Sequence, residues 1–170
     1  MAAAVPELQF HPGRLDDPRV QALLREHLQS AASLSPPERV HALDTSGLSA
    51  PGTWFWSLWA DDATLVGMCA LKTLNTAHAE IKSMRTASDW LRRGVGDAMM
   101  RHLLGQAEVL AFSRLSLETG SAPAYAPARR LYARHGFVAC GPFADYVADP
   151  HSQFMTRPLD AARPSLTCER

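Results

Sequence analysis

The spacing of apolar residues in the first part of this 170-residue chain predicts one long helix and little other regular structure. Residues 8–10 are apolar enough for a short first strand. After Pro18, apolar side chains recur every three or four positions, which is the period of an amphipathic helix; they are Val20, Leu23, Leu24 and Leu28. Pro36 and Pro37 start a second short helix through about residue 43. Residues 45–52 are rich in Ser, Gly and Pro and predict a loop.

The pattern then changes from a helical period to strands. Three strand-like runs lie at residues 53–60 (TWFWSLWA), 64–74 and 79–86, and short polar turns separate them. Together they predict an antiparallel meander. Strict alternation in the third run places two sets of side chains on opposite faces. These sets are Glu80, Lys82 and Met84 on one face, and Ile81, Ser83 and Arg85 on the other.

Helices and strands alternate in the second half of the chain. An apolar stripe predicts a helix that begins after Gly94; its members are Val95, Met99, Leu103, Ala107 and Leu110. A strand at residues 114–118 follows, and then a helix with Pro127 in its first turn and Gly136 as its C-cap. Two last strands are predicted at residues 137–143 and 153–159. With no repeat or linker, residues 1–170 predict a single domain of the α/β (α+β) class.

Composition narrows the classes of function. The 17 Lys and Arg residues balance the 17 Asp and Glu residues, whereas a protein that binds nucleic acid by neutralising phosphates is more basic. No apolar run reaches the roughly 18 residues of a membrane-spanning helix. The opening residues MAAAVPELQF lack the basic and apolar regions of a signal peptide. We therefore expect a cytoplasmic protein that binds neither nucleic acid nor membrane.

The cysteines and histidines predict no metal site. Cys69, Cys140 and Cys168 stand far apart, and no pair of Cys or His residues has the spacing of zinc ligands. Cys69 and Cys140 lie in apolar runs, where free cysteine behaves as a small buried hydrophobic residue. We expect reduced thiols and no bound metal.

The stretch DWLRRGVGDAMM, residues 89–100, carries the strongest chemical signal. Two arginines stand directly before a glycine-containing bend that opens a helix. A helix N-terminus exposes unpaired N–H groups and the positive end of the helix dipole, and glycine lets an anion approach the backbone closely. Arginine adds charge-assisted hydrogen bonds. The combination predicts a phosphate site, although a plain turn with two solvated arginines fits this stretch equally well.

Two other phosphate sites fit the stretch poorly. A Rossmann dinucleotide site needs a third glycine where Met99 stands, and it follows a buried strand, whereas Trp90 to Arg93 precede Gly94 here. Glu118 would supply the acid of such a site. A P-loop needs Gly-Lys-Ser/Thr, which this stretch lacks.

Three motifs in order, RRGVG, RLSLETG and ARRLYARHGF, resemble the GNAT superfamily of acetyl-CoA-dependent N-acetyltransferases. The likeness is strong over residues 77–143, and the later motifs are similar to those of a group of bacterial acetyltransferases. The resemblance implies the GNAT fold, which is a central mixed, mostly antiparallel sheet of about six to seven strands flanked by about four helices. It also implies acetyl-CoA as the co-substrate and no metal.

The resemblance implies a set of residues that contact the cofactor. The family binds the CoA pyrophosphate through backbone N–H groups of a Gln/Arg-x-x-Gly-x-Gly/Ala loop, and the matching residues here are Arg92, Arg93, Gly94, Val95, Gly96 and Asp97. The strand residues Met84, Arg85 and Thr86 would meet the pantetheine and the acetyl carbonyl. Two positions depart from the family pattern. Leu91 replaces the usual Gln or Arg, and Tyr125 stands where many members have an Asn that touches pantetheine.

The resemblance also implies catalytic residues. Tyr132 matches the tyrosine that protonates the departing thiolate, although tyrosine on an amphipathic helix is also a common core residue. Glu80 matches a position where some members carry a general base. An acceptor amine must lose a proton to attack, and a nearby carboxylate can take it. The alternative for Glu80 is a solvated residue or a pair with Lys82 or Lys72.

The acceptor side is less well defined. Glu118 ends a strand beside the predicted cleft; it either caps the following turn, which we favour, or contacts the acceptor. Asp145 and Tyr146 lie in the loop between the last two strands, which borders the acceptor in this fold. The acids of this loop suit a cationic substrate and plain solvation equally well.

We therefore expect an N-acetyltransferase that moves acetyl from acetyl-CoA to a primary amine by direct attack in a ternary complex. The alternative is a non-catalytic acyl-CoA-binding sensor or interaction module of the same fold, and a third option is another acyl group or a hydroxyl acceptor. The expected partner is a small-molecule or peptide amine whose identity the sequence leaves open. The sequence is compatible with a homodimer.

Overall fold

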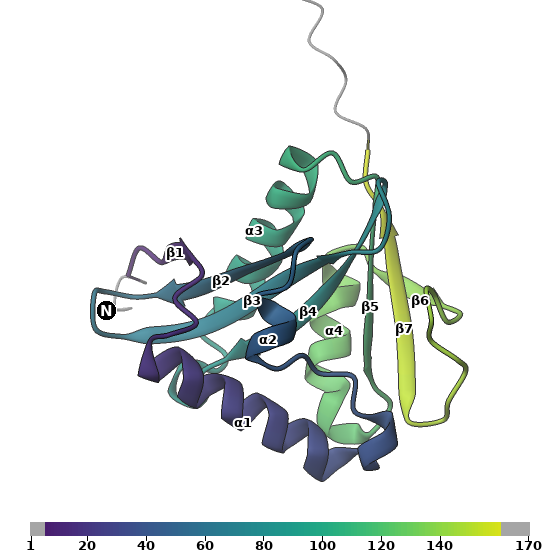
Figure 1. Ribbon diagram of the computed structural model, residues 1–170, viewed down its shortest axis with the longest axis horizontal. Helices are drawn as coiled ribbons and strands as arrows, with labels where there is room; N and C mark the ends of the chain where they lie inside the picture. The colour runs from purple at the N-terminus through teal and green to yellow at the C-terminus, as the bar shows by residue number, and fades with distance from the viewer. Residues whose placement is uncertain (1–5, 161–170) are drawn as a thin grey trace, which may run out of the picture.

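Seven strands form one sheet in the computed structural model, which describes residues 6–160 of the chain (Figure 1). Their order across the sheet is β1-β2-β3-β4-β5-β7-β6. The strands are β1 (Gln9–Pro12), β2 (Thr53–Trp59), β3 (Leu65–Thr73), β4 (His78–Thr86), β5 (Arg114–Gly120), β6 (Val138–Cys140) and β7 (Ser152–Pro158). Every neighbouring pair is antiparallel except β4 and β5, which run parallel. The predicted mixed, mostly antiparallel sheet is therefore confirmed.

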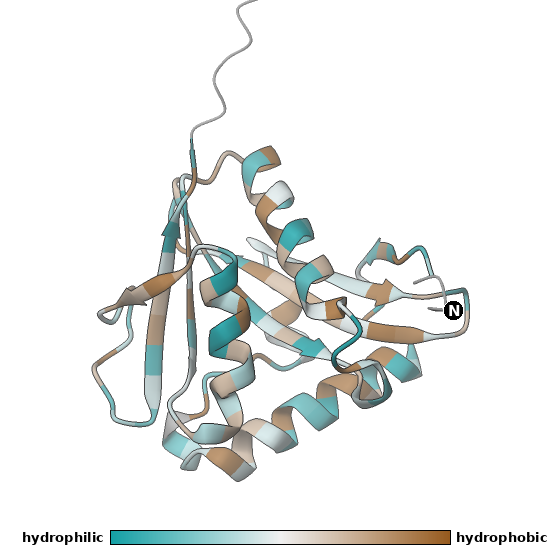
Figure 2. Cartoon of the chain, turned by 180° about the vertical axis from the view of Figure 1, so that it is seen from behind, coloured by the Kyte–Doolittle hydropathy of each residue, from teal (hydrophilic) through white to brown (hydrophobic). Residues whose placement is uncertain are grey.

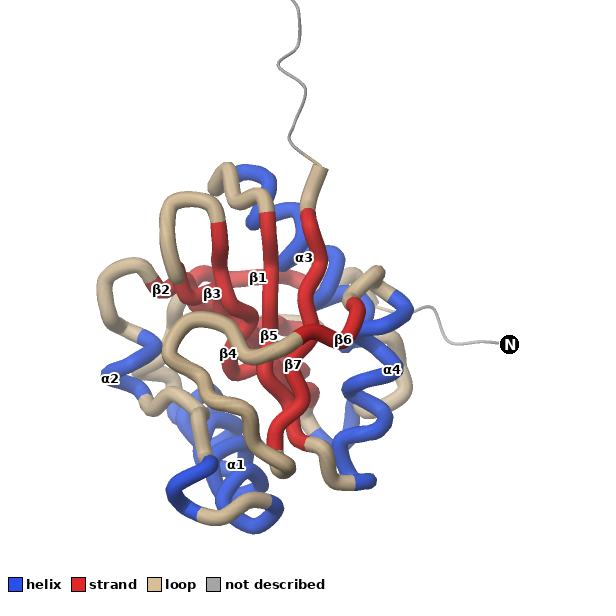
Figure 3. The backbone as a smooth tube through the Cα atoms, turned by 90° about the vertical axis from the view of Figure 1, so that its right-hand side faces the viewer, coloured by secondary structure: helices blue, strands red, loops and turns tan. Residues whose placement is uncertain are grey.

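Helices cover both faces of this sheet, as the view from the side shows (Figure 3). The helices α1 (Pro18–Leu34) and α2 (Thr45–Leu48) pack on one face, called the α1 face. The helices α3 (Val95–Val109) and α4 (Ala126–Arg134) pack on the other, called the α3 face. Asp17 begins α1, because its carboxylate accepts a hydrogen bond from the Arg19 N–H at 2.8 Å. The described residues thus contain four α-helices, as predicted, and three short 3-10 turns.

Each face of the sheet has its own apolar core. On the α3 face the buried members include Trp56, Leu58, Leu71, Met99, Met100, Leu103, Phe112, Leu115 and Phe137. On the α1 face they are Val20, Leu23, Leu24, Leu48, Phe55, Trp59, Met68 and Ala70. Brown apolar positions concentrate on the central strands, while the helices alternate between brown and teal, as amphipathic helices do (Figure 2).

Three segments differ from the predicted elements. The helix expected at residues 37–43 is only the 3-10 turn Pro37–Arg39, and Val40 is already extended. The predicted loop at 45–52 contains α2, because the Asp44 carboxylate accepts hydrogen bonds from the Gly47 N–H at 2.9 Å and the Ser46 hydroxyl at 2.8 Å. Only β6, Val138–Cys140, forms within the strand expected at 137–143, so Cys140 lies near the sheet edge and is half-buried. Cys69 is buried as predicted, and Cys168 lies outside the described residues.

A β-bulge in β4 breaks the predicted alternation of its side chains. Met68 pairs with Arg85 while Ala70 pairs with Lys82, so β4 carries one extra residue in this interval. Ser83 absorbs it with a left-handed φ of 51°. As a result Met84 joins Ile81 against the core of the α3 face, and the side chains of Lys82 and Arg85 both reach partners on the α1 face. The predicted grouping of Met84 with Glu80 and Lys82 is therefore wrong.

The parallel pairing of β4 with β5 is short. Three residue pairs are aligned, from His78 with Arg114 to Glu80 with Ser116. Beyond Glu80 the two strands separate, so β4 residues 81–86 have no β5 partner. Backbone groups on this side of β4 are left to bind something other than a neighbouring strand. The place where β4 and β5 separate, after Glu80 and Ser116, is called the cleft below.

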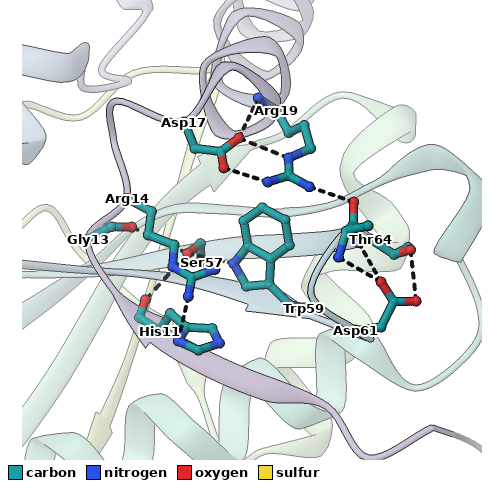
Figure 4. Close-up of polar contacts among 10 residues, drawn as sticks. His11, Gly13, Arg14, Asp17, Arg19, Ser57, Trp59, Asp61 and Thr64 are labelled. Atoms are coloured by element: carbon teal, nitrogen blue, oxygen red, sulfur yellow. Dashed lines mark hydrogen bonds and ion pairs between the residues drawn. The ribbon is translucent and has the colours of Figure 1, made fainter.

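A second polar region, called the Trp59 cluster, consists of side chains gathered around one aromatic ring (Figure 4). Trp59 of β2 is fully buried. The guanidinium groups of Arg14 and Arg19 lie 5.2 Å and 4.5 Å from the centroid of its ring. Arg19 also pairs with Asp17 at 2.7 Å and donates to the carbonyl of Ala63 at 2.8 Å. The cluster ties the start of α1 to the turn between β2 and β3.

Candidate active site

The bend before α3 is exposed to solvent and lies at one end of the cleft. Gly94 is the N-cap of α3 with a φ of 82°, and a Cβ added there would meet no atom within 4 Å. The N–H groups in the first turn of a helix have no intrahelical acceptors, and the helix dipole is positive there. The space around Gly94 is open, so the bend can offer an anion the donors of this first turn.

Asp97, the acid in the first turn of α3, turns away from this bend. Its carboxylate lies 2.8 Å from Nε2 of His135 and accepts a longer hydrogen bond of 3.4 Å from Arg134. The hydrogen bond with His135, together with the charge of Arg134, lowers the pKa of Asp97. Its side chain thus joins α3 to the end of α4, and only its backbone N–H remains for the predicted phosphate contact.

Among the other residues of the bend, one allows close packing of two helices and two are exposed cations. A Cβ on Gly96 would lie 2.9 Å from a methyl group of Leu131, so Gly96 allows α3 and α4 to approach closely. Arg92 adopts a φ of 57°, and both Arg92 and Arg93 are exposed. The Arg93 guanidinium lies 5.2 Å from the centroid of the Trp90 ring. Within residues 6–160, neither of these two cations beside the helix N-terminus belongs to an ion pair.

The other end of the cleft holds the Glu80 network, which consists of Glu80, Lys82, Tyr146 and the backbone carbonyl of His41. Glu80 is 2% exposed, and its Oε1 accepts hydrogen bonds from the Tyr146 hydroxyl at 2.5 Å and from Lys82 Nζ at 3.3 Å. Lys82 Nζ also donates to Tyr146 Oη at 3.0 Å and to the His41 carbonyl at 2.8 Å. The pairing of Glu80 with Lys82, one alternative from the sequence, is thus present.

Lys82 is the centre of this network because all three of its N–H groups are used. They connect β4 to the segment before α2 and to the loop between β6 and β7, which lies on the α1 face (Figure 3). The loop is also held by aromatic contacts: the Tyr146 ring lies 5.1 Å from Phe143 and 5.3 Å from Phe154, centroid to centroid. Burial and the charge of Glu80 raise the pKa of Tyr146, so this hydroxyl stays protonated.

Glu118 on β5 faces the same side of the sheet and differs from Glu80 in its partners. It belongs to no ion pair within residues 6–160, and it is only half-buried. Burial raises the pKa of Glu118, against the opposing effects of a hydrogen bond with Ser152 and of the His41 and Lys82 charges. A carboxyl with a raised pKa is a stronger base than a solvated one, which suits proton transfer near neutral pH.

Tyr132 on α4 lies deep beside the cleft. It is 9% exposed and meets Phe137 edge to face, with 6.3 Å between the ring centroids. Burial, with a smaller contribution from the charge of Glu118, raises the pKa of Tyr132 to about 12. Tyr132 is therefore both a core residue and a protonated hydroxyl within the electrostatic reach of Glu118.

The remaining predicted residues take up different positions. The ring of Tyr125 lies against Gly120, where an added Cβ would come within 2.1 Å of it. Burial and the charge of Glu118 raise the pKa of Tyr125, while a hydrogen bond with Ser35 opposes this rise. Tyr125 thus reaches from the β5 side of the cleft toward the end of α1. Asp145 is exposed and stands outside the Glu80 network, although its neighbour Tyr146 is central to it.

Sequence reasoning missed several polar residues of this region. The His78 Nε2 atom lies 2.6 Å from Ser116 Oγ, which is in turn 2.8 Å from Thr156 Oγ1. Alternation along β4 and β5 would have placed His78 and Ser116 on the face of Glu80 and Glu118, once the parallel register of the two strands was known. The contribution of His41 comes from its backbone carbonyl, which no side-chain pattern signals.

Two further observations bear on cofactors and environment. Within residues 6–160, no three His, Cys, Asp or Glu side chains gather as a group that could hold a metal ion. None of the helices in this described part of the chain is long and apolar enough to cross a membrane.

Comparison with known proteins gives results at two levels. The model of the Acetyltransferase (GNAT) family matches residues 20–137. The uncharacterized N-acetyltransferase YsnE of Bacillus subtilis is 50% identical over 141 residues, which is 83% of this chain and 93% of that protein. The uncharacterized N-acetyltransferase YedL of Escherichia coli is 47% identical over 145 residues, or 85% and 91% of the two chains.

Solved structures show the same fold at lower identity. A spermidine N-acetyltransferase from Vibrio cholerae, in complex with CoA and spermine, superposes with a TM-score of 0.68. It is 16% identical, and the match covers 91% of this chain and 96% of that one. This likeness concerns the arrangement of strands and helices described above.

Proposed function

Because the chain belongs to the GNAT family of acetyltransferases, we propose that it transfers the acetyl group of acetyl-CoA to a primary amine, with both substrates bound together. The protein is an acyltransferase; the amine and the direct mechanism are the proposal. The observation that supports it most is the cleft, with free donors and arginines at one end and carboxylate and tyrosine side chains at the other.

The end of the cleft at α3 fits the pyrophosphate of acetyl-CoA. The backbone N–H groups that follow Gly94 can donate to its oxygens, and the exposed Arg92 and Arg93 add charge. The backbone groups of β4 from Met84 to Thr86 lack a β5 partner and can pair with the amides of the pantetheine arm. The side chain of Arg85 lies on the α1 face, so its predicted cofactor contact is limited to its backbone.

The amine nitrogen then forms a bond to the acetyl carbon, and the carbon–sulfur bond breaks with its electron pair going to sulfur. The amine must give up a proton, and two carboxylates compete for it. Glu80, the base that the resemblance implies, is already occupied by Lys82 and Tyr146. Glu118 has a raised pKa, belongs to no ion pair within residues 6–160, and is the charge that acts on Tyr132. We therefore assign the base to Glu118 and a positioning role to Glu80.

The departing sulfur needs a proton donor. With a pKa of about 12, Tyr132 is protonated at neutral pH and can donate to the thiolate as it forms. The proton that Glu118 takes from the amine replaces the one that Tyr132 gives, which balances the reaction. Acetyl-amine and free CoA are the products.

A thiol-release assay with acetyl-CoA and a panel of amines tests the proposal. We expect free thiol with at least one amine and intersecting lines in double-reciprocal plots at several fixed amine concentrations. Parallel lines would instead show a covalent acetyl-enzyme. Binding of CoA with no thiol release for any acceptor would mean that the fold serves as an acyl-CoA sensor.

The variant Tyr132→Phe separates a catalytic hydroxyl from a core residue. It keeps the ring and its packing against Phe137, so we expect kcat to fall by about 10²-fold or more with little change in the KM for acetyl-CoA. An unchanged kcat would leave Tyr132 as a core residue alone.

A further inference from the structure

Two polar atoms on β4 are buried without hydrogen-bond partners at the β-bulge. They are the hydroxyl oxygen of Ser83, a residue that is 7% exposed, and Nε of Arg85. Buried polar groups in native proteins are nearly always paired, because removing them from water without compensation is costly. Ser83 also holds a left-handed φ of 51°, which a non-glycine residue rarely adopts. Such strained and unpaired groups tend to cluster where a ligand binds.

The charge of Arg85 is poorly neutralised by its surroundings. Its acidic neighbour is Glu26 of α1, which is 54% exposed and lies 4.0 Å from the guanidinium group. Burial, with smaller effects from the charges of Arg85 and Lys82, lowers the pKa of His27 to about 4, so His27 is neutral near pH 7. Lys82 is already paired with Glu80. The counter-charge of Arg85 is therefore one exposed carboxylate, 4.0 Å away.

Arg85 stands beside the part of the cleft where the acceptor would lie. Its charge acts on Tyr125, and so does the charge of Glu118. Tyr125 packs against Gly120 at the end of β5 and bonds to Ser35 near the end of α1. Glu118 and Arg85, one acidic and one basic, are thus both within electrostatic reach of Tyr125. The anionic end of CoA is directed to a different place, the N-terminus of α3.

We propose that Arg85 and Ser83 bind a carboxylate of the acceptor, which is therefore a small amino acid-type molecule with its amine near Glu118. The inference rests on the proposed function and narrows the acceptor from primary amines in general to amines that carry an acid group. A guanidinium group matches the two oxygens of a carboxylate in a bidentate contact, and Nε is one of the donors that such a contact uses. The Ser83 hydroxyl supplies a further donor.

Matched acceptor pairs test this proposal directly. Glycine, L-leucine and L-phenylalanine are compared with their amides in the thiol-release assay, with wild type, Arg85→Met, Arg85→Lys and Ser83→Ala. We expect wild type to favour an acid over its amide by about tenfold or more in kcat/KM. Arg85→Met should raise the KM for the acid by about 10- to 100-fold, with Arg85→Lys intermediate, while the KM for acetyl-CoA and the rates with amides change little.

Arg25→Met is the matched control, because Arg25 is an exposed arginine of α1. It should leave the preference for acids intact. Equal use of acids and amides by wild type would overturn the proposal, and so would an Arg85→Met variant that raises only the KM for acetyl-CoA. Circular dichroism confirms that each variant is folded, and Ser83→Ala supplies a milder variant if Arg85→Met is not.

A binding measurement separates failure of this inference from failure of the proposed function. Calorimetry with CoA present compares N-acetyl-L-phenylalanine with N-acetyl-L-phenylalaninamide, and needs no turnover. Binding of the acid alone, lost in Arg85→Met, would support the carboxylate site even if no amine were acetylated. Acetylation of the amides, with no binding of the acid, would overturn the site and leave acetyl transfer to amines in place.

Discussion

The Trp59 cluster and the surroundings of the Glu80 network contain the same kinds of polar groups. They differ in how many of these groups have hydrogen-bond or ion-pair partners. Each combines an aromatic ring with at least one cation and one carboxylate. In the Trp59 cluster the indole N–H bonds to Ser57, and the guanidinium of Arg19 bonds to both Asp17 and a backbone carbonyl. Around the Glu80 network, Glu118 belongs to no ion pair within residues 6–160, and the buried atoms of Ser83 and Arg85 have no partners.

This difference indicates which region serves the fold and which serves the reaction. A polar cluster whose members are all paired gains nothing from a ligand, so its loss should appear in stability. A cluster beside a cleft that has shifted pKa values and unpaired polar groups can still bind a ligand. The following changes test that division, beginning with the largest expected effect.

Glu118→Gln should reduce kcat by about 10²- to 10⁴-fold, because the proposed base can no longer accept the amine proton. In wild type, kcat should fall on acidification as the raised pKa of Glu118 is passed, since only the ionised carboxylate accepts a proton. The variant should lose this acidic limb. A full pH profile of kcat provides the measurement.

Two further variants serve as the comparison for Glu118→Gln. Glu108→Gln, an exposed carboxylate of α3, should have normal turnover. Glu80→Gln removes the charge that pairs with Lys82 and should act by loosening the loop that carries Tyr146. If Glu80→Gln alone abolished the acidic limb, Glu80 would be the base, as the family resemblance implies.

Trp59→Ala should lower the free energy of unfolding by about 3 to 5 kcal/mol. Removal of a fully buried indole leaves a cavity, and two guanidinium groups lose their contact with its ring. Urea denaturation measures this change. The fraction that remains folded should keep the kcat of wild type, since no atom of the cluster reaches the cleft. A fall in kcat of the folded fraction would show that the two regions are coupled.

Gly94→Glu should weaken acetyl-CoA binding by about 10- to 100-fold, because a side chain at a φ of 82° distorts the bend and its charge repels the pyrophosphate. Calorimetric titration with CoA provides the affinity. Gly105→Glu makes the same change later in α3, where an added Cβ also meets no atom within 4 Å. That control should bind CoA normally, and equal affinities for both variants would place the phosphate elsewhere.

The smallest expected effect concerns how the stability of the core on the α3 face changes at acidic pH. Burial lowers the pKa of His102 to about 4, and its ring stacks on Phe10 at 3.9 Å between centroids. Between pH 6.5 and pH 4 the unfolded state therefore holds more protons at this residue, so stability falls as the pH falls through this window. His102→Leu should reduce the loss between pH 7 and pH 5 by about 1 kcal/mol, because solvent reaches part of the ring and screens its charge.

Urea denaturation at the two pH values measures this loss. His27 has a pKa lowered in the same direction, so part of the acid sensitivity should remain in the variant. The exposed His151 offers a control, and His151→Leu should keep the full loss. An unchanged loss in His102→Leu would mean that His102 is protonated in the folded protein at pH 5.

The sequence predicted the elements whose signals are local. Aromatic and β-branched runs predicted β2 and β3, and the bend at Gly94 predicted the start of α3. It did not predict the bulge at Ser83, because alternation assumes one residue per step, and a left-handed serine has no sequence signature. The same bulge put the Arg85 side chain on the α1 face, whereas strict alternation had grouped it with Ile81.

Contacts between segments that are distant in the chain could not be predicted from the sequence either. Tyr146 and Glu80 are 66 residues apart, and Lys82 reaches a backbone carbonyl 41 residues away. Such pairs depend on how two loops fold over one face of the sheet. Residue types could suggest Glu80, Glu118 and Tyr132 as candidates. Only the packing shows that Glu80 belongs to an ion pair while Glu118, within residues 6–160, does not.

The bulge at Ser83 also sets a limit on improving this protein. A sheet with regular β4 would keep more backbone pairs and shed a strained serine, so variants selected for heat resistance alone should drift toward repairing it. Repair would shift every residue after Ser83 to the opposite face, which would turn Arg85 into the core of the α3 face and move the backbone groups proposed to bind pantetheine. A gain in thermal stability at that position should therefore lower the proposed activity.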